Sequence, residues 1–347
     1  MTHALTGALL ARATVRNPEP DGISLRARIA LGFFAAAFPD SDIVATQFGP
    51  LAYLWNHRGI THSLLLLPLW AAALGLVCSY VMRRDARCWK SCAEVAALGI
   101  GSHILTDLIT PYGTQILAPF LDTRYAWSTT FIIDLWFSGI IILGLLLSAW
   151  WGSTRKPAVV ALSLLVAYVG LQFVQRGRAL EFAEAHARAT GMTDYTVNAI
   201  PEPPLPFNWN AFVTDDRNQH YALVSLLRSE APSSLAPDAG FFTRIAAPYM
   251  PLDQAVWITA PRYGDTDADR ALAREAWNHP KFAFFRWFAT QPALYRIERG
   301  AATCVWFEDL KFFTPGRGHM PFRYGMCNEG GEWSAYRLLE PGRARVN

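Results

Sequence analysis

Histidine and aspartate residues recur in segments of residues 3–134 that are otherwise apolar. His103 and Asp107 stand four residues apart in SHILTDLITPYGT. On a helix they share one face, where an imidazole and a carboxylate one turn apart can bind the same metal ion. Asp40 and Asp42 stand in FPDSD, and they can point into one pocket only where the backbone leaves a helix. These spacings predict a metal site.

The turn NHRGITHS adds two imidazoles, His57 and His62, and its glycine allows them to converge. Nitrogen and oxygen donors without cysteine suit zinc, manganese or iron, and the imidazole content favours zinc. Polar residues at membrane depth are costly, so each one is a functional-site hypothesis. The candidate ligands are His3, Asp40, Asp42, His57, His62, His103, Asp107 and Asp134. Eight donors exceed the four of one zinc ion, so either some support the ligands or the site holds two or three ions.

Other polar residues beside these donors are candidates for catalysis and substrate binding. Asp40 or Asp42 could bridge metal ions or act as a base, and Arg58 could hold a phosphate oxygen. Hydrogen bonds to a substrate could come from the residues after the His103 helix, namely Tyr112, Thr114 and Gln115. Purely structural roles are the alternatives: a headgroup-paired arginine, a plain turn after Pro111, and capping acids at turns or helix starts.

The composition indicates a chain that lies partly in a membrane. Of its 347 residues 52% are hydrophobic and 17% are charged, whereas an average soluble domain carries roughly 25% charge. The mean hydropathy is +0.15. A net charge of +3 is too small to indicate a nucleic-acid partner.

Long apolar runs predict the helices that carry the candidate ligands. Ser63–Met82 has no charged residue over about twenty positions, the length that crosses a bilayer. Phe131–Trp151 and Pro157–Gln175 are similar, while Arg28–Phe38 and Ser91–Thr110 are apolar with embedded polar groups. A further short helix is expected over THALTGALLARAT.

The sequence therefore predicts an all-α polytopic membrane helical bundle with a C-terminal soluble α+β domain. Residues 1–177 form the membrane-embedded metal-site domain, and residues 178–347 form the second domain, which opens on a helical extension of the last span. Its helices are expected at Asp267–Asn278 and Lys281–Thr290. Its strands are expected at Tyr195–Ile200, Asn210–Thr214, Tyr221–Leu227, Thr303–Asp309, Met320–Cys327 and Trp333–Leu339.

Basic residues predict the orientation of these helices. Three connecting stretches contain ten Lys or Arg residues, and the two others contain Arg58 and Arg124 only. Basic loops are cytoplasmic, so the candidate ligands and the C-terminal domain are expected to face outward. Cys304 and Cys327 would then lie in an oxidising compartment and form a disulfide if their strands pair. Two unpaired buried cysteines are the alternative.

The segments THALTG, FPDSD, HRGITHS and SHILTDLITPYGT resemble the YdjM-type family of inner-membrane metal-dependent hydrolases. That family is more distantly similar to the zinc-dependent phospholipase C and single-strand nuclease group. The resemblance implies a bacterial inner membrane location and a zinc cluster. The ligands it implies are His3, Asp40 or Asp42, His57 or His62, His103 and Asp107.

These observations favour a multi-pass hydrolase that uses a metal-activated water to cleave a phosphoester. A site at the boundary between lipid and water favours an amphiphilic substrate, such as a phospholipid or a lipid-linked phosphate. Besides such a substrate, the expected partner is the lipid bilayer. The alternative is a non-enzymatic membrane protein that binds, senses or transports a metal ion. An intramembrane metalloprotease is disfavoured, because H-E-x-x-H is absent.

Overall fold

The computed structural model describes residues 1–15, 23–82, 88–152, 154–232, 239–317, 320–339 and 342–346. It divides into two compact units. The helical unit comprises Met1–Gln47 and Trp55–Phe173, and the sheet unit comprises Phe48–Leu54 and Val174–Asn347.

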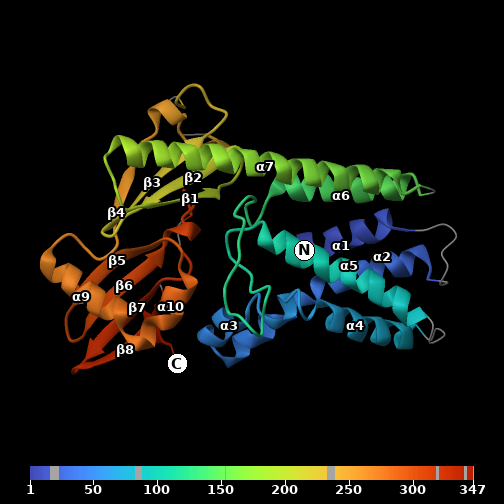
Figure 1. Ribbon diagram of the computed structural model, residues 1–347, viewed down its shortest axis with the longest axis horizontal. Helices are drawn as coiled ribbons and strands as arrows, with labels where there is room; N and C mark the ends of the chain where they lie inside the picture. Colours follow the sequence, from blue (N-terminus) through green and yellow to red (C-terminus); the bar gives the residue numbers. More distant parts are fainter. Residues whose placement is uncertain are drawn as a thin grey trace. The chain divides into compact units, whose positions relative to one another are not determined.

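Every apolar segment expected in the N-terminal half is helical (Figure 1). Two short 3₁₀ helices, Pro39–Phe48 and Ile60–His62, carry the polar motifs between these helices. The α-helices are α1 Thr2–Ala13, α2 Leu25–Ala37, α3 Pro50–Asn56, α4 Leu67–Val81, α5 Trp89–Leu108, α6 Leu135–Trp150 and α7 Lys156–Ala189. The helical extension expected after the last span is confirmed, because α7 continues without a break to Ala189.

Glycines let the backbones of α1, α2 and α5 pack in close contact. A Cβ atom on Gly7 would lie 2.2 Å from the carbonyl oxygen of Gly32, and one on Gly99 would lie 3.0 Å from the same oxygen. Close contacts through small residues are typical of helix packing in membranes. In this arrangement His3 of α1 stacks on His103 of α5, and His103 meets the carbonyl oxygen of Ala36 in α2.

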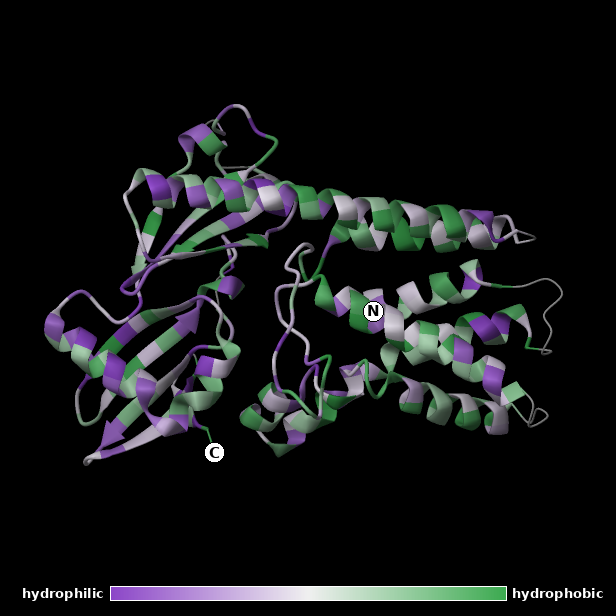
Figure 2. Cartoon of the chain, viewed as in Figure 1, coloured by the Kyte–Doolittle hydropathy of each residue, from purple (hydrophilic) through white to green (hydrophobic). Residues whose placement is uncertain are grey.

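Two helical stretches in the described part of the chain are long and apolar enough to cross a bilayer. They are Leu25–Phe48 and Lys156–Ala189, and a third span exists if the pair Pro50–His62 and Leu67–Val81, bent by 77°, counts as one. The run Ser63–Met82 is shortened because the hydroxyl of Ser63 accepts from the backbone N–H of Leu65 and Leu66, which form a turn before α4. Figure 2 shows that hydrophobic residues dominate α6 and the first half of α7. The chain thus contains apolar membrane-length helices, and a six-helix crossing stays a prediction.

The sheet unit contains two antiparallel sheets, with strand orders β1-β2-β3-β4 and β5-β6-β7-β8-β9. The first strands are β1 Thr196–Pro201, β2 Asn208–Thr214, β3 Asn218–Ser225 and β4 Ile258–Pro261. The others are β5 Pro292–Arg299, β6 Thr303–Asp309, β7 Tyr324–Glu329, β8 Glu332–Leu338 and β9 Arg343–Arg345. All six expected strands are present, and β4, β5 and β9 were not expected from the sequence.

Helices cover both sheets. The C-terminal part of α7 lies along the first sheet, where Ala183 and Ala187 pack against Ala211 and Val213 of β2 (Figure 1). The second sheet packs against α9 Asp267–Asn278 and α10 Ala283–Phe288, and a short α8 spans Phe241–Ala246. The expected helix Asp267–Asn278 is confirmed, and the expected helix Lys281–Thr290 is present as a 3₁₀ turn followed by α10.

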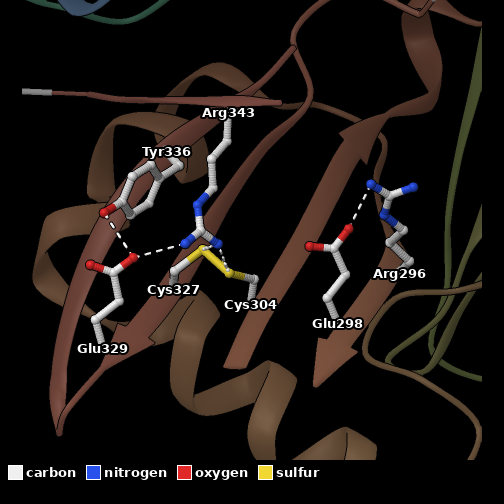
Figure 3. Close-up of a disulfide and its surroundings, with 7 residues drawn as sticks. All are labelled: Arg296, Glu298, Cys304, Cys327, Glu329, Tyr336 and Arg343. Atoms are coloured by element: carbon white, nitrogen blue, oxygen red, sulfur yellow. Dashed lines mark hydrogen bonds and ion pairs between the residues drawn. A yellow bond between two sulfur atoms is a disulfide. The ribbon is translucent and has the colours of Figure 1, made fainter. Parts of the chain in front are cut away.

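Of the two alternatives for Cys304 and Cys327, the structure contains the disulfide. Cys304 and Cys327 are directly opposite each other in β6 and β7, and their sulfur atoms are bonded. Figure 3 shows the guanidinium of Arg343 lying against this bond, where Glu329 accepts hydrogen bonds from Arg343 and Tyr336. The remaining cysteines, Cys78, Cys88 and Cys92, form no disulfide among the described residues.

Candidate metal centre

His103 is the best-defined member of the candidate centre. Its ring is fully buried on α5, and its Nδ1 lies 2.6 Å from the carbonyl oxygen of Ala36 in α2. A carbonyl oxygen only accepts hydrogen bonds, so Nδ1 carries the proton. The lone pair of Nε2 therefore points away from α2, as in histidines that bind metals.

His62 presents a second lone pair to the same point. Its ring is fully buried at the end of the 3₁₀ helix Ile60–His62, and its Nε2 lies 3.0 Å from Nε2 of His103. On the other side of the ring, Nδ1 faces the carboxylate of Asp42 at 3.4 Å, which favours a proton on Nδ1. Two imidazole lone pairs at this distance repel each other unless a positive charge lies between them.

Asp107 adds a carboxylate to this convergence. Its Oδ2 lies 3.2 Å from Nε2 of His62 and 3.4 Å from Nε2 of His103. Both of its oxygens are buried, and neither meets a well-directed hydrogen bond among the described residues, although four nitrogens lie within 3.4 Å of them. A buried carboxylate with such imperfect partners is suited to binding a cation.

The spacing of these atoms fits a tetrahedral ion. Zinc at its usual distances from nitrogen and oxygen separates neighbouring ligand atoms by about 3.3 Å. The separations among His62, His103 and Asp107 are 3.0 to 3.4 Å, and Oδ1 of Asp40 lies 3.5 Å from Nε2 of His103. Asp40, His62 and His103 thus form one group of convergent ligand atoms, and Asp107 lies against two of them.

His3 forms a second group with His103 and Asp107. Its Nδ1 lies 2.7 Å from the hydroxyl oxygen of Thr106, which itself donates to the main chain of α5. Nδ1 of His3 is therefore the donor, and its Nε2 faces Oδ1 of Asp107 at 3.3 Å. The ring of His3 also stacks on that of His103, with the centroids 4.1 Å apart. The two groups share one member, His103, so the number of ions stays a prediction.

Asp42 lies behind the convergent atoms. Its Oδ1 is 3.0 Å from Nδ1 of His57, and its Oδ2 accepts from the backbone N–H of Arg58 at 2.8 Å. The geometry thus distinguishes the members of two pairs that the sequence left open, Asp40 or Asp42 and His57 or His62. Asp40 and His62 belong to the convergent group, whereas Asp42 and His57 support the turn that carries His62.

Arg58 turns its guanidinium inward. Nη2 lies 3.0 Å from Oδ1 of Asp107, and Nη1 donates to the hydroxyl of Thr110 at 2.8 Å. The residue has a φ of 64°, and in this turn the ring of His57 and the backbone N–H of Arg58 each meet one oxygen of Asp42. Arg58 therefore neutralises one oxygen of Asp107 and leaves the other toward the two imidazoles.

The loop after α5 holds this turn in place. Gln115 donates from Nε2 to the carbonyl oxygen of Trp55 and from its backbone N–H to that of Arg58, both at 2.9 Å. The ring of Tyr112 lies between the guanidinium groups of Arg58 and Arg124, at 4.7 and 4.9 Å. Thr114 pairs through its backbone with Tyr125. Substrate contacts by these three loop residues stay predictions.

Asp134 is not brought into either group. It caps α6 by accepting from the backbone N–H of Phe137 at 2.8 Å, and its other oxygen accepts from the hydroxyl of Tyr168 at 2.7 Å. The structure instead adds two residues that sequence reasoning missed, Thr106 and Thr110, which bind His3 and Arg58. The one signal for them is their place three residues after His103 and Asp107.

The part of the chain that carries this centre is similar to known proteins. Residues 1–179, which contain all the candidate site residues, match a family model described as YdjM inner membrane protein. An uncharacterized protein, YfhP of Bacillus subtilis (strain 168), is 26% identical over 178 residues. The match covers 50% of this chain and 52% of YfhP, so the chain spans about half the length of the curated relative it matches. No solved structure matches the chain.

Proposed function

Because the chain belongs to the YdjM inner membrane protein family, we propose that it is a membrane-bound metal-dependent hydrolase that cleaves a phosphoester. The observation that carries this proposal is the convergence of Nε2 of His62, Nε2 of His103 and Oδ2 of Asp107 within 3.4 Å of one another. This set of ligand atoms is electron-rich and buried, so a bound divalent cation would offset the repulsion among them. Zinc is the leading choice.

A cation held there would polarise a phosphoryl oxygen and lower the pKa of water. The chain's own residues divide the remaining tasks. Arg58 fixes Asp107 through Oδ1 and supplies positive charge beside the site. Asp40 has a side chain that is 48% exposed, so it is the carboxylate of the group that can take a proton from water arriving from solvent.

The same exposure supports an enzyme over a structural metal site. Structural zinc sites are closed by four protein ligands, whereas catalytic sites keep one position open. His62, His103 and Asp107 are buried, but Asp40 is half exposed and the side chain of His3 is 23% exposed. A substrate can therefore reach the candidate centre past these two residues.

The outward orientation of the site is part of the proposal. Disulfides persist in oxidising compartments, and the bond between Cys304 and Cys327 supports a sheet unit outside the cytoplasm. Cys78, Cys88 and Cys92, which form no disulfide among the described residues, lie within or beside a basic connecting stretch that we expect to be cytoplasmic.

Metal analysis joined to an activity assay tests the proposal. The full chain, purified in detergent, is analysed for bound metal and is then assayed with phosphomonoester, phosphodiester and phospholipid substrates, with and without a chelator. His62→Ala and Asp107→Ala should each lose most of the metal and the activity. The matched control is His279→Ala, because His279 lies in the sheet unit, where its Nδ1 accepts from the backbone of Lys281.

The outcomes separate the two function classes. Chelator-sensitive hydrolysis that both site variants lose supports the hydrolase. Bound metal without hydrolysis of any phosphoester would favour the non-enzymatic alternative, a protein that binds, senses or transports the ion. Unchanged metal content in both site variants would refute the site itself.

A further inference from the structure

An apolar cavity of about 590 Å³ lies inside the helical unit beside the candidate metal centre. Its walls come from α1, α5, α6 and α7 and from the loop that follows α5. The volume lies within the range of binding pockets for small molecules, about 300–1,000 Å³. Leu10, Leu98, Phe137 and Leu165 are typical of the lining.

The hydroxyl groups that line the cavity already donate hydrogen bonds. Its hydroxyl groups are those of Thr6, Ser102 and Thr106, and each donates to a carbonyl oxygen of its own helix at 2.8 to 3.0 Å. A polar ligand would lose its hydrogen bonds to water here without gaining new ones. The cavity therefore selects hydrocarbon.

Thr106 joins the cavity to the metal centre. Its side chain lines the cavity, and its hydroxyl accepts from Nδ1 of His3, whose Nε2 faces Asp107. On α5 the centre and the cavity lie on adjacent faces, with His103 and Asp107 on one and Leu98, Ser102 and Leu105 on the other. A molecule with a polar end at Asp107 can thus place its apolar part in the cavity.

The cavity is open on one side. Three lining residues remain exposed, Leu105 by 51%, Trp127 by 42% and Val166 by 74%. Val166 belongs to α7, one of the two stretches long and apolar enough to cross a bilayer. The neighbouring medium is then lipid, and a chain can enter from the bilayer between these residues.

We propose that this cavity holds one acyl chain of a phospholipid whose phosphate lies at the His3–Asp107 end. The proposal rests on the proposed function and gives it a substrate class, a glycerophospholipid. It commits to an acyl chain because acyl lipids are the bulk hydrocarbon of an inner membrane, which this family occupies.

Photo-crosslinking tests the proposal without requiring turnover. The full chain is placed in vesicles of phosphatidylethanolamine and phosphatidylglycerol that contain phosphatidic acid with a diazirine at the end of one acyl chain. A chelator prevents hydrolysis during irradiation. We expect adducts on the residues that line the cavity within the ranges 98–106 of α5 and 162–169 of α7.

A matched pair of substitutions on α7 sharpens the result. Val169→Trp fills the cavity and should reduce these adducts about tenfold, equivalent to roughly 1.4 kcal/mol of binding. Leu171→Trp changes an exposed residue of the same helix that does not line the cavity, so its adducts should be unchanged. If Val169→Trp fails to fold, Ala97→Phe fills the cavity from α5 instead.

Two results would overturn the proposal. Adducts spread evenly over the exposed faces of the helices, or equal yields in the cavity-filling and control variants, would show that the cavity holds no chain. Displacement by polyprenyl phosphate at concentrations where unlabelled phosphatidic acid has no effect would refute the acyl assignment. Cavity adducts without phosphoester hydrolysis in the metal-loaded protein would refute the hydrolase alone and leave the chain-binding site standing.

Discussion

Replacing Asp42 by asparagine distinguishes the ligands of the candidate centre from the residues that orient them. Asp42 is 8% exposed, and its carboxylate meets Nδ1 of His57 at 3.0 Å, the backbone N–H of Arg58 at 2.8 Å and Nδ1 of His62 at 3.4 Å. Asparagine keeps the size of the side chain and removes its charge. Its amide oxygen can still accept from Arg58.

The expected effect follows from these contacts. His62 keeps its position but loses the charged partner at Nδ1 that makes its Nε2 a stronger metal ligand. Loss of such an outer partner costs about 10–100-fold in metal affinity, which corresponds to about 1.4–2.7 kcal/mol. The free energy of unfolding should fall by only about 1 kcal/mol, because the hydrogen bond to Arg58 survives as a neutral one.

Competition between the protein and a chromogenic chelator measures this affinity for zinc. In Asp42→Asn the binding curve should shift to higher free metal by the stated factor and reach the same final stoichiometry. Asp107→Asn replaces a member of the convergent group and should reduce the stoichiometry itself. His279→Ala serves as the control with an unchanged curve.

The reasoning fails if the two variants exchange their behaviour. Complete loss of metal from Asp42→Asn at saturation, with full stoichiometry in Asp107→Asn, would mean that Asp42 is a ligand and that Asp107 supports it. An Asp42→Asn curve that coincides with that of the unaltered chain would mean that the charge behind His62 has no effect.

Further predictions concern the sheet unit and the topology. Replacing Cys304 and Cys327 by serine opens a link between residues 23 apart and should lower the free energy of unfolding by about 3 kcal/mol, measured by denaturant titration of the full chain. Burial raises the pKa of Glu202 well above its usual range. The stability that its neutral form contributes is therefore present at low pH and is lost as the pH rises through the raised pKa. Glu202→Gln should flatten this decline in stability, measured by thermal melts recorded across pH. A cysteine at exposed Thr123, in a chain without its native free thiols, should react with an impermeant reagent in intact cells, whereas one at Arg84, which lies outside the described residues, should not; the reverse pattern would invert the orientation.

The elements that the sequence predicted well carry their own local signals. α9 begins where Thr266 accepts from the backbone N–H of Asp269, and both its bounds match the expectation. β5 escaped prediction because it opens on a proline and its register shifts between Leu294 and Arg296, which breaks the alternation of side chains. β9, Arg343–Arg345, contains two arginines and no large apolar residue.

The candidate site likewise contains residues that the sequence predicts and residues that it does not. His103 and Asp107 follow from helical spacing alone. The choice between Asp40 and Asp42 does not, because they lie in a 3₁₀ helix, where residues two apart point in very different directions. The choice of His62 over His57 does not follow either, because the turn between them contains Arg58 with a positive φ, a conformation that non-glycine residues rarely adopt and that the sequence does not signal.

The hydrogen bond from His103 to the carbonyl oxygen of Ala36 has an evolutionary consequence. A main-chain acceptor is present whatever residue occupies position 36, so no point mutation there deletes it chemically. Variation is restricted by volume instead, since Ala36 is fully buried and a Cβ atom on Gly7 would lie 2.4 Å from its side chain. Substitutions at position 36 are therefore restricted to small residues, whether polar or apolar. The orientation of His103 is thus inherited through helix packing, whereas Nδ1 of His62 meets two replaceable side chains, the carboxylate of Asp42 and the hydroxyl of Thr61.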